Sequence, residues 1–221
     1  MSKCTIALGL LLRNEWPHRK LFLDAGYKAV FAHFWQKAHI YPEVNIVQTQ
    51  PTTWAYTLHA HLSLFRAFLK SKSTHIMLCS DTCVPIATHD DARERLVKSV
   101  SYFTVPELFA SHPKRKDAPP FMPYLKAEQW AIYSKEAAAC IVKEWYMFIR
   151  LYGKLIGGNE IAGASWLLKN QLPVEQVNGV YTEWEAGITH PKTFTDLEAL
   201  KRKAQGYVTA RKYIKNDAPN S

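Results

Sequence analysis

The sequence predicts a single α/β domain with a largely parallel central sheet flanked by helices. Its 221 residues suit one domain and are enough to bury a core without disulfides or a metal ion. The chain is 48% hydrophobic and 21% charged, which is typical of a globular protein and excludes a disordered one. Strand-like and helix-like segments alternate through the first two thirds of the chain, an order that favours parallel strands joined by helices.

The predicted strands are short apolar runs. Residues 4–12 form the longest run, as expected for a strand that is covered on both faces. Shorter runs predict further strands at residues 28–34, 44–48, 75–79, 129–133 and 180–184.

The clearest predicted helix spans residues 55–70. There Leu58, Leu62, Phe65 and Leu69 recur at helical spacing and form one apolar face. Capping residues and periodicity predict further helices at residues 17–26, 90–98, 134–152, 160–169 and 196–203.

The ends of the predicted domain follow from composition. We expect the folded domain to span residues 1–215 and the polar residues 216–221 to form a disordered tail. No apolar run reaches the ~18 residues of a membrane span, and no cleavage site follows the first run, so we expect neither an integral membrane segment nor a signal peptide. The four cysteines match no zinc pattern and are expected to be reduced thiols in a cytoplasmic protein.

The net charge of +9 points to an anionic partner, which could be nucleic acid, a membrane surface or a phosphate-bearing small molecule. The chain contains neither GxxxxGK[ST] nor GxGxxG, so a P-loop or a dinucleotide-binding domain is not expected.

Candidate site residues follow the predicted strands, because ligands of parallel sheets gather at the carboxyl ends of the strands. This rule singles out Arg13, Asn14, His33 and Asp81. The Asp81 carboxylate could hold a metal ion, a ribose hydroxyl or a sugar hydroxyl, or it could cap a turn.

Two further groups are candidates on charge. Glu160 follows two glycines and an asparagine at the start of a predicted helix, so it is either a favourable charge at the helix end or a general base. Basic residues near the end of the chain, among them Arg211 and Lys212, are either a solvated face or a clamp for a diphosphate.

Several segments taken together resemble the core-2/I-branching glycosyltransferases, which form glycosyltransferase family fourteen, and their plant and microbial relatives. The similar segments are, in family order, Trp54 with the helix at 56–69, SDTCVPI at 80–86, KAEQWA at 126–131, GNEI at 158–161 with WLL at 166–168, and TEW at 182–184, HPKTF at 190–194 and ARKY at 210–213. The resemblance covers about residues 53–213 and implies a GT-A-like fold.

The resemblance also implies an activity, namely inverting transfer of a sugar from a nucleotide-sugar donor, with UDP the expected nucleotide, to a carbohydrate hydroxyl. Glu160 falls on the position of the family's catalytic base, and Lys212 with its neighbour Arg211 falls on the donor diphosphate contact. Trp130 and Glu128 fall in the segment that we expect to contact the acceptor. Arg13, Asn14, His33 and Asp81 are then the remaining expected donor contacts.

The family works without a metal ion, but one departure favours a metal here. Glu185 stands where relatives often have an arginine, which removes one expected phosphate contact. We therefore expect Mn²⁺ or Mg²⁺, held by Asp81 and the phosphates, to assist. The alternatives are a basic nucleic-acid-binding protein without enzymatic activity and a degenerate sugar-binding protein on the same fold.

Overall fold

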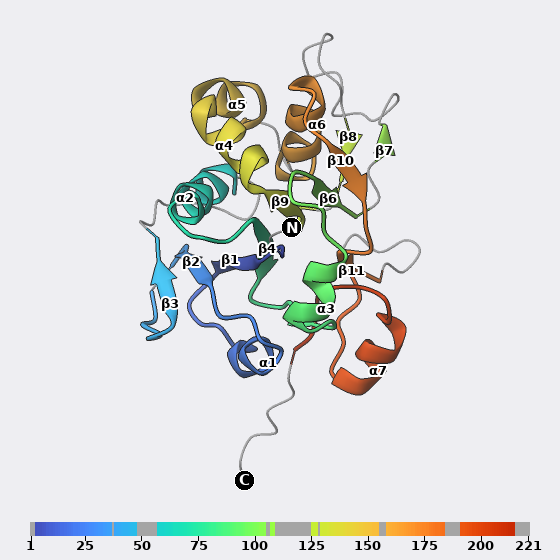
Figure 1. Ribbon diagram of the computed structural model, residues 1–221. Coiled ribbons are helices and arrows are strands. Elements are labelled where there is room, and N and C mark those ends of the chain that lie inside the picture. The colour runs from blue at the N-terminus through green and yellow to red at the C-terminus, as the bar shows by residue number, and fades with distance from the viewer. Residues whose placement is uncertain are drawn as a thin grey trace.

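A seven-stranded sheet with the strand order β10-β6-β9-β4-β1-β2-β3 runs through the protein (Figure 1). The computed structural model describes residues 3–36, 38–47, 57–104, 107–108, 125–127, 129–154, 158–183 and 191–214. The strands of the sheet are β1 (Ile6–Leu12), β2 (Val30–Phe34), β3 (Val44–Ile46), β4 (His75–Ser80), β6 (Ser101–Phe103), β9 (Ile132–Ser134) and β10 (Val174–Gln176). Within this sheet β9 runs antiparallel to both of its neighbours and the other pairs are parallel, so the predicted, largely parallel α/β sheet is confirmed.

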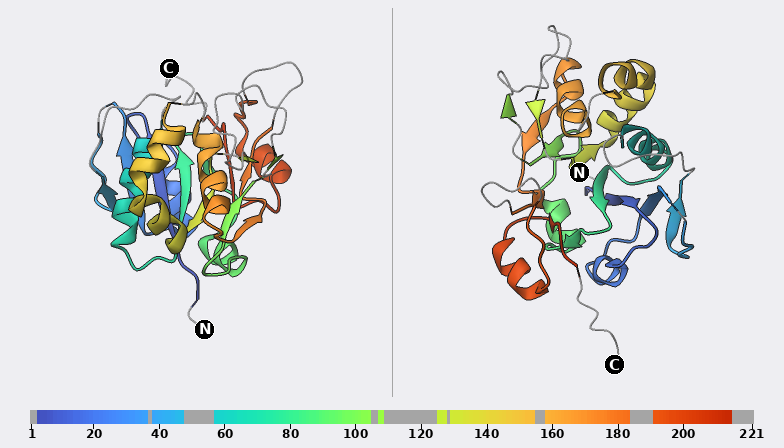
Figure 2. Two further views of the ribbon diagram at one scale, coloured as in Figure 1. Left: turned by 90° about the horizontal axis from the view of Figure 1, so that it is seen from above. Right: turned by 180° about the vertical axis from the view of Figure 1, so that it is seen from behind.

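Helices cover both faces of the sheet (Figures 1 and 2). On one face, α1 (Arg19–Asp24) and α3 (His89–Glu94) pack through Phe22 and Ala92 against Leu8 and Leu10 of β1. The other face is covered by α2 (Leu58–Leu69), α4 (Lys135–Lys143), α5 (Trp145–Tyr152) and α6 (Ala162–Lys169). Because helices lie on both faces, both faces of β1 are apolar and all seven of its residues are buried.

Close packing at the centre of the sheet favours a glycine in β1. A Cβ atom on Gly9 would lie 2.8 Å from Ile76 Cδ1 and 2.9 Å from Leu78 Cδ2 of the neighbouring β4. The side chains of β4 therefore fill the space that any larger residue at position 9 would need.

Two small sheets adjoin the large one. In the first, β12 (Thr209–Ala210) lies between β11 (Val180–Tyr181) and β5 (Val84–Pro85). The second pairs β7 (Glu107–Leu108) with β8 (Leu125–Lys126). The antiparallel pairing of Ala210 with Val84 brings the late part of the chain beside the residues that follow β4, and α7 (Leu197–Lys203) packs through Leu200 against this sheet.

The structure differs from the expected elements at several places. The helix predicted at residues 134–152 is two helices, because Glu144 adopts φ −108° and ψ 26° between α4 and α5. The change of direction lets Phe148 and Tyr152 pack on Trp166, with ring centroids 5.6 and 6.5 Å from it. The helix predicted from residue 160 starts instead at Ala162, after a 3-10 turn over Gly158–Glu160.

Other elements differ in length or place. The strand predicted at residues 129–133 is shifted to β9, and α1 is shorter than the helix expected at residues 17–26. The predicted tail at 216–221 lies outside the described residues, as do Glu128 and Glu185.

Candidate functional site

The candidate site lies at the carboxyl end of the sheet, between β1 and β4. The strand order reverses here, because the chain passes from β1 outward to β2 and β3 and then returns to β4 on the other side of β1, so this junction is a topological switch point. In the left view of Figure 2 the parallel strands run from the side marked N toward the opposite edge, which carries their carboxyl ends. Ligands of open α/β sheets bind in the crevice at such a point.

The register of the two strands places the expected residues side by side. Leu11 of β1 pairs with Ser80 of β4, so Arg13 and Asp81 follow at the same edge. Asn14 is exposed there, and the exposed Arg13 donates a hydrogen bond from Nε to Gln36 Oε1 at 3.0 Å. The register thus places Arg13, Asn14 and Asp81 at the same end of the sheet.

Residues 211–213, which follow β12, cross this edge. The Tyr213 backbone N–H donates to the Thr82 carbonyl at 3.2 Å, and the Arg211 N–H donates to the Tyr181 carbonyl at 3.1 Å. Between them Lys212 has φ 65°, in the left-handed region that an L side chain rarely adopts. Such strained conformations persist where the surrounding structure holds them, and they cluster at functional sites.

The Asp81 cluster, which we define as Asp81, His18 and Lys212, brings one carboxyl group near two basic side chains. Burial raises the pKa of Asp81, while the Thr82 N–H and the charges of Lys212 and His18 act in the opposite direction. Burial also lowers the pKa of His18, against the raising effects of Asp81 and of the Tyr213 carbonyl, 3.1 Å from His18 Nε2. The half-buried Asp81 carboxyl group and Lys212 thus lie near each other at the carboxyl ends of β1 and β4.

Arg211 lies against Trp130. The guanidinium carbon is 5.6 Å from the centroid of the Trp130 ring, a cation–π contact, and both side chains are buried. Burial by itself would raise the pKa of Cys83 nearby, but hydrogen bonds with Cys79 and Ser80 and the charge of Arg211 lower it. Because the Trp130 ring is buried and carries Arg211, its evident role is to hold that guanidinium, and its expected contact with an acceptor stays a prediction.

Glu160 is joined to the same neighbourhood through the backbone. Its carbonyl accepts a hydrogen bond of 2.7 Å from the N–H of Ala127, three residues before Trp130. Glu160 is half-buried, and no hydrogen bond or ion pair joins its carboxylate to the part of the chain that the structure describes. The adjacent Asn159 is buried, and within that same part its Oδ1 has no hydrogen-bond partner, a condition that a bound ligand or water normally relieves.

A buried polar cluster lies behind this site. His33 on β2 and His61 on α2 are both buried, and burial together with the nearby His33 lowers the pKa of His61 to about 3. Gln129 Nε2 donates to Thr57 Oγ1 at 3.2 Å and lies 3.4 Å from His61 Nε2. His33 was expected to face the donor at the strand end, and the structure instead has its side chain fully buried among these groups.

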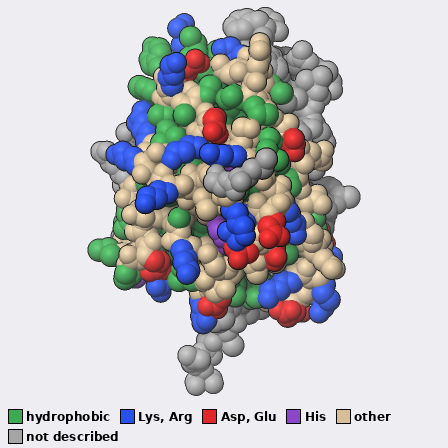
Figure 3. All heavy atoms as spheres, in the orientation of Figure 1, with side chains coloured by type: hydrophobic (Ala, Val, Ile, Leu, Met, Phe, Trp, Pro, Cys, Tyr) green, Lys and Arg blue, Asp and Glu red, His purple; other side chains and the backbone are tan. Residues whose placement is uncertain are grey.

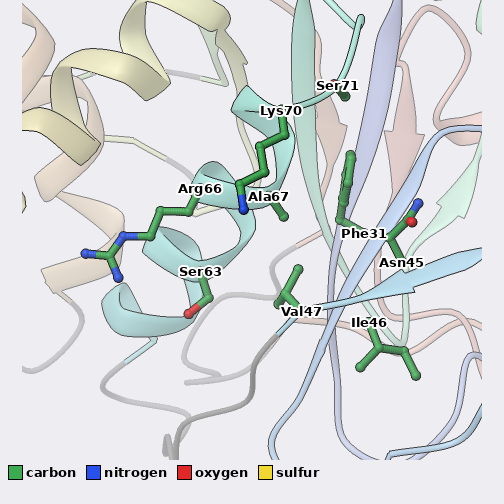
Figure 4. Close-up of a pocket in the computed structure, with 9 residues that line it drawn as sticks. All are labelled: Phe31, Asn45, Ile46, Val47, Ser63, Arg66, Ala67, Lys70 and Ser71. Carbon is green, nitrogen blue, oxygen red and sulfur yellow. The ribbon is translucent and has the colours of Figure 1, made fainter.

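A groove of about 650 Å³ lies elsewhere, between α2 and the β2–β3 edge of the sheet (Figure 4). None of the predicted site residues lines it. It is lined by Phe31, Asn45, Ile46, Val47, Ser63, Arg66, Ala67, Lys70 and Ser71. Several of its polar groups are already used, since Ser63 donates to the His59 carbonyl, Asn45 donates to the Val30 carbonyl, and Arg66 turns away from the groove onto Trp145. The groove is therefore a weaker candidate than the switch point.

Three features of the described chain concern metal ions, membranes and the cysteines. Within the described residues no three His, Cys, Asp or Glu side chains gather as a metal site would require, so a metal ion at Asp81 would need further ligands from outside this set. None of the helices in the described ranges is both long and apolar enough to cross a membrane. All four cysteines are free thiols.

Comparison with known proteins returns no match to a family model, and no curated protein is significantly similar to the chain. The functional argument therefore rests on the residues of the site and on their geometry.

Proposed function

We propose that the protein is an inverting glycosyltransferase of GT-A-like fold. It would transfer a sugar from a nucleotide-sugar donor, most simply a UDP-sugar, to a hydroxyl of a carbohydrate acceptor. One observation carries the proposal: residues 211–213 cross the switch point, with Lys212 beside Asp81 and Arg211 on Trp130.

The two cations suit a donor diphosphate. Lysine and arginine neutralise phosphate charge through charge-assisted hydrogen bonds, and they do so most strongly where burial lowers the local dielectric constant. Arg211 is buried and Lys212 is half-buried, so both are partly withdrawn from water. In this proposal they hold the diphosphate and stabilise the charge that develops on it as it leaves, while Arg13 and Asn14 contact the nucleotide.

Glu160 is the proposed general base. Its carboxylate takes the proton of an acceptor hydroxyl while that oxygen forms a bond to the anomeric carbon. The bond from the anomeric carbon to the diphosphate oxygen breaks, and its electron pair leaves with the diphosphate. Attack from the face opposite the leaving group inverts the configuration. General-base assistance of this kind is typically worth ~10²–10⁴ in rate.

Asp81 is the proposed ligand for Mn²⁺ or Mg²⁺ in the donor complex. These ions bind one or two carboxylates together with substrate phosphates, so a single protein carboxylate fits the requirement. The bound cation would supply additional positive charge to the diphosphate. Burial raises the pKa of Asp81, and the nearby charge of Lys212 acts against this by favouring the ionised form that such an ion needs.

A binding experiment tests the proposal before any acceptor is known. Thermal unfolding is measured with uridine, UDP and a panel of nucleotide sugars, each with Mn²⁺ and with EDTA. A ligand at 100 times its Kd stabilises the folded state by about 2.7 kcal/mol, which is readily detected. Lys212→Ala should weaken UDP binding about 10- to 100-fold, since a hydrogen bond to a charged group is worth about 1.5–3 kcal/mol, and should leave uridine binding unchanged.

The control and the contrary outcomes are distinct. Lys201→Ala removes one positive charge from α7, where Lys201 pairs with Glu198 at 3.0 Å, and should leave UDP binding unchanged. Equal weakening of UDP and uridine by Lys212→Ala would remove Lys212 from the phosphates. Absence of nucleotide binding, with DNA affinity that falls linearly with salt on logarithmic axes, would replace the proposal with a nucleic-acid-binding function.

A further inference from the structure

Helix α5 is apolar on nearly every side. Seven of its eight residues, in the sequence WYMFIRLY, are aromatic or aliphatic, and Arg150 is its one charged residue. A surface helix of a globular protein normally keeps a polar face toward solvent, and a helix that is apolar all round is normally covered.

The protein covers one face of α5 and leaves the other exposed. Phe148 and Tyr152, one helical turn apart, are buried against Trp166 of α6. On the exposed face, Trp145 is 40% exposed, Tyr146 67% and Met147 45%. The packing of Phe148 and Tyr152 fixes the helix, and on its exposed side the Trp145 and Tyr146 rings lie with their centroids 6.0 Å apart.

Positive charge surrounds the exposed side chains. Lys143 and Lys154 flank α5, Arg150 lies within it, and all three are exposed. The Arg66 guanidinium carbon lies 5.5 Å from the centroid of the Trp145 ring. Two acidic side chains that precede α5 in the sequence, Glu136 and Glu144, are also exposed. In Figure 3, green and blue side chains, with red among them, lie at the upper left, where Figure 1 places α5.

We propose that the α5 patch, which we define as Trp145, Tyr146 and Met147 with Lys143 and Arg150, docks the protein onto an anionic lipid surface. Tryptophan and tyrosine have an apolar ring and a polar group, so they partition to the boundary between headgroups and acyl chains. Lysine and arginine beside them attract anionic headgroups, and their long apolar stems suit the same boundary.

The charge of the patch favours a lipid surface over a protein partner. Protein interfaces are depleted in lysine at their centres, whereas an interfacial membrane helix combines aromatic residues with Lys and Arg. The whole chain carries +9, which adds long-range attraction to an anionic surface. The helix has eight residues and would lie along the surface without spanning it. The inference does not depend on the proposed enzymatic function.

Vesicle co-sedimentation of the full chain tests the inference. The protein should bind vesicles containing 30 mol% phosphatidylserine at low salt, bind much less at high salt, and bind vesicles of phosphatidylcholine alone only weakly. Lys143→Gln/Arg150→Gln should lower the partition coefficient about 25-fold, because each cation near an anionic surface contributes about 1 kcal/mol. Trp145→Ala/Tyr146→Ala should lower it at least about tenfold, and circular dichroism should show an unchanged fold.

A matched control variant distinguishes vesicle binding through the α5 patch from binding through exposed apolar side chains in general. Ile40→Ala/Val97→Ala removes two exposed apolar side chains, 81% and 56% exposed, from elsewhere on the protein and should bind vesicles as the wild type does. Equal binding of the α5 variants and the wild type would overturn the inference and assign binding to net charge. Absence of vesicle binding, with an oligomer that Trp145→Ala/Tyr146→Ala dissociates in light scattering, would assign the patch to a second copy of the chain.

Discussion

The buried His61 should make the protein less stable in acid by an amount that can be calculated. Burial and the nearby His33 lower the pKa of His61 to about 3 in the folded state, whereas its ordinary value is 6.5. At a pH between these two values, His61 is protonated in the unfolded chain and neutral in the folded protein. The stability that depends on this difference is fully present above pH 6.5 and is lost progressively as the pH falls toward 3.

The size of the loss follows from the two pKa values. At pH 5 the unfolded chain holds nearly one full proton on His61 and the folded protein holds almost none. The free energy of unfolding is then about 2 kcal/mol lower than at pH 8, on the basis of 1.36 kcal/mol for each pKa unit. Burial also lowers the pKa of His18 and His75, and these residues add to the loss in the wild type and in any His61 variant alike.

Urea unfolding followed by tryptophan fluorescence at pH 8 and pH 5 measures the effect. His61→Gln cannot take up the proton, so its free energy of unfolding should fall by about 2 kcal/mol less than that of the wild type over this range. His59→Gln changes an exposed histidine two residues away on the same helix and should behave as the wild type. If His61→Gln and the wild type lose the same stability, or if the His61 ring protonates near pH 6 by NMR, the reasoning is refuted.

Two further predictions concern backbone geometry. Lys212→Gly should be about 1 kcal/mol more stable in urea unfolding than Lys212→Ala, because glycine adopts the φ of 65° without strain. Both variants should bind UDP equally weakly. Equal stabilities of the two variants would argue against a left-handed conformation at residue 212. Gly163→Ala should lower the free energy of unfolding by about 1–3 kcal/mol, because a Cβ atom there would overlap Tyr133 Oη in the core. Tyr133→Phe should restore part of that lost stability. An unchanged free energy of unfolding in Gly163→Ala would show that α6 packs less closely on β9.

Much of the large sheet could be predicted because its central strands and α2 have strong local patterns. The unbroken apolar run in β1 indicates a strand that is buried on both faces. The rule that ligands gather at the carboxyl ends of strands then identifies Arg13 after β1 and Asp81 after β4. The spacing of Leu58 and Leu62 predicts α2, and His61 lies three residues after Leu58 on that apolar face. The same helical periodicity therefore predicts that His61 is buried.

The parts that could not be predicted depend on contacts between distant segments. β6, β10 and β12 are two or three residues long, so hydrophobic periodicity has too few positions to detect them. The reversed direction of β9 and the break at Glu144 are set by tertiary packing, which overrides local helix and strand preference. The contact of Arg211 with Trp130 joins residues that are about 80 positions apart, and no local pattern carries it.

The rate of sugar transfer by Glu160→Gln tests the central claim most directly. Donors that stabilise the wild type in thermal unfolding are supplied with a panel of carbohydrate acceptors, and single-turnover transfer is measured beside Glu175→Gln, which changes an exposed glutamate on β10. Glu160→Gln should bind the donor as the wild type does and lose ~10²–10⁴ in rate, while Glu175→Gln keeps the full rate. Transfer by Glu160→Gln at the wild-type rate would contradict the assignment of the base, and binding of a nucleotide sugar by the wild type without transfer to any acceptor would identify a sugar-binding protein instead of an enzyme.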